Sequence, residues 1–188
     1  MFLERFLRAL PRRWRLFTAL AVALAHLPAH APARADPGVR IGSRGGLELR
    51  DTTDPYLGLD LRLSFPLTPL TLNPTFDYVF DPNRTLYEIS LNALYYLPIP
   101  IQRIDPYLGV GANFTSFSFK QLMPGVDNTG NRLGLNLIAG TCFDLPIASP
   151  FAQVEKAISE LDFVSFSAGV MVALDGDSRW TGCGRRAP

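Results

Sequence analysis

Apolar and polar residues alternate with a period of two along almost the whole chain after Asp36. This period places successive side chains on opposite faces of a β-strand. Eight such runs follow one another, and Pro, Asp, Asn and Gly clusters separate them. The runs cover residues 39–50, 56–65, 70–80, 87–97, 107–115, 133–144, 150–158 and 164–174. The seventh run is the least regular, because Lys156 shares a face with Ala152 and Val154. The pattern predicts an all-β chain of eight strands.

The connections between these runs alternate in character. The second, fourth and sixth connections, at 65–70, 97–106 and 145–150, are short and contain proline, which ends a strand because it cannot donate to the ladder. The other connections are more polar, and the longest covers 120–131. This alternation predicts an up-and-down antiparallel order, with tight turns at one end and polar loops at the other.

The sequence DPYLG occurs twice, at 54–58 and 105–109. Both copies have the same phase, with tyrosine and glycine on the polar face and leucine on the apolar face. The copies fall on the second and fifth strands, which run in opposite directions, so they do not indicate a duplicated hairpin. We interpret the motif as a strand start, in which Asp-Pro ends the preceding loop.

The chain begins with the features of a secretory signal peptide. Arginines precede the apolar run 16–27, and small residues in an A-x-A pattern end at Ala35. Cleavage after Ala35 would leave a barrel domain at 36–174 and a C-terminal tail at 175–188. We therefore expect an exported protein.

The charge and histidine content after Ala35 argue against several functions. Six of the 18 cationic and one of the 17 anionic residues precede Asp36, which leaves 12 and 16 and a net charge of −4. This balance gives no case for nucleic-acid binding. Both histidines, His26 and His30, lie in the predicted signal peptide. We therefore expect no catalytic site, no cofactor and no metal.

Alternation alone does not decide whether the apolar face of a barrel points inward, as in a soluble lipid carrier, or outward into a membrane. Runs of about ten residues match the length of a tilted membrane-spanning strand. Aromatic residues also flank an aliphatic middle on the apolar face, as two membrane interfaces require. They are Phe65, Tyr95 and Phe143 near the turns, and Phe76, Tyr78, Phe80, Tyr87, Phe114 and Phe166 toward the loops. The favoured fold is an eight-stranded antiparallel up-and-down transmembrane β-barrel.

The polar face carries nearly balanced charges. In a membrane barrel they would fill the lumen as an ion-pair network, because charges buried together must be paired. On a soluble barrel the same residues would form an ordinary solvated surface. These residues are Arg40, Arg44, Glu48, Arg50, Asp60, Arg62, Asp77, Glu88 and Glu155.

The phrases PYLGVGANF at 106–114 and PFAQVEKAI at 150–158, together with eight strands, resemble the small outer-membrane barrels of the outer-membrane-protein-A type. The resemblance covers nearly all of 36–174. It implies turns in the periplasm, loops outside the cell and insertion by the outer-membrane assembly machinery. Such barrels commonly end on an aromatic residue that this machinery reads. This chain continues past Leu174, so Trp180 or the strand interior would carry that signal.

The two cysteines, Cys142 and Cys183, are both expected at the turn end of the barrel. In an oxidising compartment they can form a disulfide that folds the tail under the barrel, or remain two independent thiols. The sequence leaves both alternatives open.

The leading functional hypothesis is an outer-membrane protein with a structural, anchoring or envelope-maintenance role and with outer-membrane lipids as partners. Eight strands enclose a lumen that side chains fill, so a general diffusion pore is not expected. Leu122, Met123 and Val126 in the longest loop could contact a partner outside the cell. The alternatives are a soluble periplasmic barrel that holds an apolar ligand inside, and a narrow ion channel.

Overall fold

The computed structural model describes residues 38–50, 52–65, 70–99, 103–119, 129–143, 145, 148–159 and 162–174. The chain divides into two units, Met1–Pro32 and Ala33–Pro188, and the described residues all lie in the second. The predicted signal peptide, the tail at 175–188 and the predicted contact residues Leu122, Met123 and Val126 lie outside the described residues. Within the described ranges, no helix is long and apolar enough to cross a membrane.

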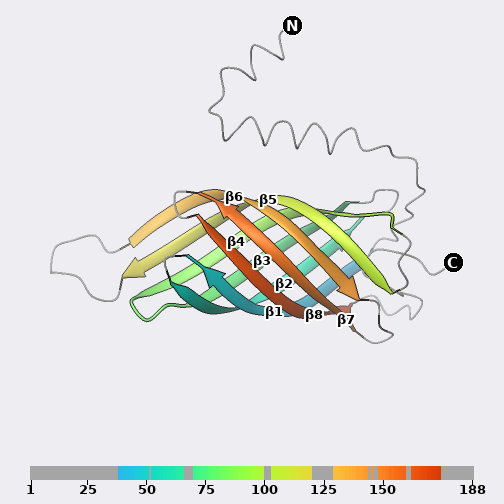
Figure 1. The fold of residues 1–188 in the computed structure, drawn as a ribbon, viewed down its shortest axis with the longest axis horizontal. Helices are drawn as coiled ribbons and strands as arrows, with labels where there is room; N and C mark the ends of the chain where they lie inside the picture. The colour runs from blue at the N-terminus through green and yellow to red at the C-terminus, as the bar shows by residue number, and fades with distance from the viewer. Residues whose placement is uncertain are drawn as a thin grey trace, which may run out of the picture. The chain divides into compact units, whose positions relative to one another are not determined.

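Eight antiparallel strands form a closed barrel in sequence order, and β1 closes the ring by pairing with β8 (Figure 1). This is the predicted up-and-down order. The strands are β1 (Gly38–Leu49), β2 (Thr53–Ser64), β3 (Leu70–Phe80), β4 (Arg84–Tyr96), β5 (Ile104–Phe119), β6 (Thr129–Phe143), β7 (Ser149–Ile158) and β8 (Phe163–Ala173).

The two ends of the barrel differ. We call the end that holds the β2–β3, β4–β5 and β6–β7 connections the turn end, and the opposite end the loop end. At the loop end, β5 and β6 extend beyond their neighbours (Figure 1). Their ladder continues to the pair Ser118–Thr129, inside the region that the sequence pattern assigned to a loop. Phe117 explains the difference, because it packs on a buried apolar cluster at this end.

The DPYLG segments also lie further inside the strands than predicted. Asp54 pairs with Glu48 across β1 and β2, and Asp105 pairs with Cys142 across β5 and β6. Both aspartates therefore belong to ladders rather than to the preceding loops. The predicted phase of the motif is confirmed, because Tyr56 and Tyr107 are buried and Leu57 and Leu108 are exposed.

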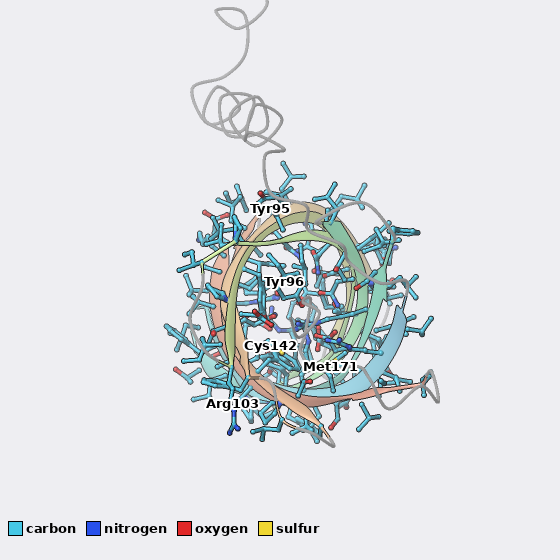
Figure 2. The ribbon with its side chains drawn as sticks, turned by 90° about the vertical axis from the view of Figure 1, so that its right-hand side faces the viewer. Tyr95, Tyr96, Arg103, Cys142 and Met171 are labelled. Carbon is cyan, nitrogen blue, oxygen red and sulfur yellow. The ribbon has the colours of Figure 1, made fainter. Side chains whose placement is uncertain are left out.

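The polar faces of all eight strands point into the barrel, and the apolar faces point outward. Figure 2 shows Tyr96, Cys142 and Met171 inside the ring of strands and Arg103 outside it. The outward leucines, isoleucines and valines of the barrel wall are exposed or half-buried, and Leu59 at 56% and Ile89 at 54% are among the exposed ones. This is the arrangement of a barrel surrounded by apolar solvent.

Aromatic rings cluster on the outer face of β3 and β4 toward the loop end. Tyr78 lies 5.0 Å from Phe80 and 5.4 Å from Tyr87 between ring centroids. Phe76 lies 6.2 Å from Tyr87. These contacts form one side of the aromatic belt that the sequence predicted at this end.

Candidate functional site

The lumen holds the predicted ionisable residues, and its centre is built around Arg44 of β1. The Arg44 guanidinium donates from Nε to Asp77 Oδ1 at 2.8 Å and also pairs with the other oxygen of that carboxylate. A second donor reaches Thr75 Oγ1 at 3.2 Å. Arg44 Nη1 lies 3.7 Å from Glu155 Oε2. One guanidinium thus joins β1 to β3 and β7 across the barrel interior.

Gly58 of the first DPYLG segment makes the contact between Arg44 and Asp77 possible. In the ladder, Gly58 lies between these two residues, paired with Arg44 on one side and Asp77 on the other. A Cβ atom on Gly58 would lie 2.0 Å from Asp77 Oδ1. The glycine therefore leaves the space that the carboxylate occupies.

We expect Gly58→Ala to destabilise the folded barrel by about 1–3 kcal/mol, the usual cost of overpacking. Reversible urea unfolding in detergent or vesicles measures this difference. Gly45→Ala is the matched control, since the new Cβ on this outward glycine would meet Leu57 Cδ2 at 3.0 Å. Equal stability of the two variants would contradict the role assigned to Gly58.

Toward the loop end, more carboxylates than cations share the lumen. Arg50 pairs with Glu48, and its guanidinium lies 4.4 Å from the ring centroid of Phe163. Glu88 accepts a hydrogen bond from Thr115 Oγ1 at 3.1 Å. A cavity of about 10 Å³ lies among these groups, enough for about one water molecule. Its lining is Arg44, Glu48, Tyr56, Asp77, Glu88, Glu155, Phe163 and Ser165.

Toward the turn end, Arg62 of β2 is enclosed by aromatic rings. Its guanidinium lies 4.5 Å from the Phe151 centroid and 5.0 Å from the Tyr107 centroid. It donates to Tyr96 Oη at 2.9 Å and to Asp60 Oδ1 at 3.2 Å. Arg62 is 1% exposed, so these groups replace water as its surroundings.

The remaining predicted residue of this set, Arg40, is buried on β1 opposite Arg62 in the register. Ion pairs join Arg44 to Asp77 and Glu155, Arg50 to Glu48, and Arg62 to Asp60. Glu88 lines the same cavity as Glu48 and Glu155. The sequence pattern identified these residues as inward-facing, whereas the register between the strands determines which side chains form ion pairs.

Sequence reasoning missed a chain of amides on the β4–β5–β6 side of the lumen. Asn136 accepts from Asn113 at 2.7 Å and donates to Ser90 at 3.2 Å and to Asn92 at 3.3 Å. All four side chains are buried. The signal was present, since each of them stands at an inward position of its strand.

Two apolar clusters inside the barrel were also missed. The one at the turn end comprises Leu94, Tyr96, Tyr107, Ile138, Cys142, Phe151 and Met171. The one at the loop end comprises Tyr56, Val79, Leu86 and the partly buried Phe117. These side chains stand at inward positions near the strand ends. In the sequence they are scattered apolar residues on otherwise polar faces, so the alternation does not indicate a cluster. Together they fill the two ends of the lumen around its charged centre.

Ser165 and Ser167 of β8 are buried in the lumen. Ser165 lines the loop-end cavity. Among the described residues, no group of three or more His, Cys, Asp or Glu side chains is arranged to hold a metal ion.

Outside the strands, the β3–β4 connection is held by Asp81. This carboxylate accepts a hydrogen bond from the Asn83 N–H at 2.8 Å and pairs with Arg84. Partial burial opposes ionisation, but the hydrogen bonds and the Arg84 charge outweigh it and lower the pKa of Asp81. The carboxylate therefore stays ionised and fixes the turn at neutral pH.

Cys142 of β6 is fully buried and takes part in a disulfide. Cys183 lies outside the described residues, so the predicted pairing of these two cysteines stays a prediction. We expect essentially no free thiol when the unreduced protein is denatured and titrated, because disulfides persist in oxidising compartments. Reductant should then expose both. Two free thiols before reduction would contradict the disulfide.

No protein-family model matches the chain, and no curated protein matches it in sequence. Several solved structures align with its fold. The N-terminal barrel domain of Pseudomonas aeruginosa OprF aligns with a TM-score of 0.56 and 14% identity over 74% of this chain and 100% of that one. Neisserial surface protein A aligns with a TM-score of 0.58 and 16% identity, over 71% and 94%. The attachment invasion locus protein Ail of Yersinia pestis gives 0.53 and 16%, over 72% and 95%.

The chain has the fold of the small eight-stranded outer-membrane barrels. This agrees with the resemblance drawn from the sequence. At 14–16% identity the likeness concerns the fold alone.

Proposed function

We propose that this protein is an integral outer-membrane barrel with a structural, anchoring or envelope-maintenance role and no catalytic activity. The observation that carries the proposal is the orientation of the two faces. Aliphatic side chains cover the outside, whereas Arg44, Asp60, Arg62 and Asp77 are buried inside. A soluble carrier of an apolar ligand would need the reverse orientation.

The filling of the lumen favours a structural role over transport. Apolar and aromatic side chains occupy both ends, and the charged centre between them is cross-linked by Arg44. A steady ion current would require both clusters to open. We therefore expect no stable single-channel conductance from the folded protein in planar bilayers.

Cell fractionation tests the location. The protein should sediment with the outer membrane, resist extraction without detergent, and migrate faster on gels when unheated than when boiled. Recovery in the soluble periplasmic fraction would overturn the proposal.

A charge scan of the outer face tests the proposal on the purified protein. Leu91 is 53% exposed midway along β4, and Thr85 lies on the same outward face at the loop end of that strand. Leu91→Arg should cost about 2–4 kcal/mol of folding free energy in vesicles, and the matched Thr85→Arg about 0–1 kcal/mol. If water surrounded the barrel, both changes would be nearly neutral, and that result would count against membrane insertion.

A further inference from the structure

Lys156 is the one charged residue at an outward position of the eight strands, all of which the structure describes. It lies on the same face as Ala152 and Val154, and its side chain is 39% exposed. Every other charged side chain within the strands stands at an inward position. A single charged side chain on a mostly apolar strand surface calls for polar partners around it.

The position of Lys156 along β7 sets its depth. Val154 pairs with Phe166, a residue of the loop-end aromatic face, and Lys156 lies two residues closer to the loop end. The strand ends two residues later, at Ile158. A charge is costly at the bilayer midplane and nearly tolerated at the interface, so this location suits a lysine whose ammonium reaches the headgroups.

A lysine also suits a position from which a charge must reach the headgroups. The chain has two lysines, Lys120 and Lys156, among 18 cationic residues. The lumen cations are all arginines, which suit buried, forked contacts. A lysine instead lays a four-carbon stem along apolar surface and carries a compact charge to the interface.

One intramolecular partner is present, but it leaves the ammonium available. Asp162, just before β8, places a carboxylate oxygen 3.6 Å from Lys156 Nζ. This separation is longer than a direct hydrogen bond, and the aspartate side chain is 59% exposed. Such an exposed pair is weak, and the ammonium has three donors.

We propose that Lys156 binds the phosphate of an anionic lipid headgroup at the loop-end face of the membrane, with Asp162 as a competing partner. This inference rests on the proposed membrane location and adds a specific lipid contact to it. The occupant is a lipid rather than free phosphate, because the neighbouring outward residues, Leu137 and Val164 in the register, form an apolar surface for acyl chains.

A direct test measures the distance between nitrogen and phosphorus. The Lys120→Arg variant, labelled with ¹⁵N at the lysine side chain, contains a single lysine and gives one ammonium signal. After reconstitution in phosphatidylglycerol vesicles in phosphate-free buffer, lipid ³¹P should dephase that signal. Absence of dephasing in folded protein would overturn the proposal, and so would dephasing that needs added inorganic phosphate.

A second test measures lipid-dependent stability. Adding anionic phosphatidylglycerol to phosphatidylcholine vesicles should raise the folding equilibrium constant of the wild type about five-fold more than that of Lys156→Gln. Lys156→Arg should keep the gain, and Asp162→Asn should enlarge it because the competing carboxylate is removed. Arg132→Gln, which removes an exposed cation at an inward position of β6, is the control for net charge and should behave as the wild type. Equal gains for the wild type and Lys156→Gln would overturn the inference.

Different results would contradict the membrane location and the Lys156 lipid contact. A chain that inserts into neither type of vesicle contradicts the proposed membrane function. A chain that folds in both, with no effect of residue 156, contradicts the lipid contact alone.

Discussion

Replacing Arg44 by glutamine should destabilise the barrel by about 3–5 kcal/mol, the cost of leaving buried charges without their partner. Arg44 compensates two carboxylates, Asp77 at 2.8 Å and Glu155 at 3.7 Å, and each of these side chains is almost fully buried. Glutamine keeps part of the hydrogen bonding but removes the positive charge. Urea unfolding of the reconstituted protein, monitored by far-ultraviolet circular dichroism and by gel mobility, measures the loss.

A double-mutant cycle separates the ion pair from other effects of the substitution. In the Arg44→Gln background, Asp77→Asn removes one of the two uncompensated charges, so the double variant should lose less stability than the two single losses combined. Arg132→Gln is the control, because Arg132 is exposed at the loop end of β6, and its loss should stay within about 0.5 kcal/mol. A loss below about 1 kcal/mol for Arg44→Gln would show that the lumen carboxylates do not depend on this guanidinium.

Whether each side chain points inward or outward could be predicted from the sequence. Successive side chains of a strand alternate between its two faces, whichever strand pairs with it. Leu57 and Leu59 are exposed and Tyr56 is buried, and the same holds for Leu108 and Tyr107 in the second DPYLG segment. Even Lys156, the irregular residue of the seventh run, stands on the outward face that its spacing predicts.

The partners inside the lumen could not be predicted, since they depend on the stagger between strands that meet only when the barrel closes. Arg44 reaches Asp77 because Gly58 stands between them in the ladder. Glu155 comes from β7, more than a hundred residues away in the chain. The strand ends were the other weak point, because aromatic residues such as Phe117 continue the ladder beyond the regular alternation.

Replacing Arg62 should have the second large effect on the stability of the barrel, because both the charge and the planar shape of its guanidinium make contacts at the turn end. Arg62→Met would leave Asp60 with the hydrogen bond from Asn73 Nδ2 at 2.7 Å but without its cation. We expect a loss of about 3–5 kcal/mol from this variant. Arg62→Lys keeps the charge, but a point-like ammonium does not reproduce a planar group that lies between rings and donates to Tyr96 Oη at 2.9 Å and Tyr107 Oη at 3.3 Å.

The loss of stability in Arg62→Lys therefore measures what the guanidinium contributes beyond its charge. We expect about 1–3 kcal/mol from its hydrogen bonds and ring contacts together. Phe151→Leu isolates the ring contact, since the Phe151 centroid lies 4.5 Å from the guanidinium carbon and leucine fills a similar volume. It should cost less than Arg62→Lys and show coupling to it in a double-mutant cycle. If Arg62→Lys were as stable as the wild type, charge alone would explain the burial of Arg62. If Arg62→Met lost no more than Arg62→Lys, the aromatic enclosure would be the dominant contact, and Asp60 would not need a cation.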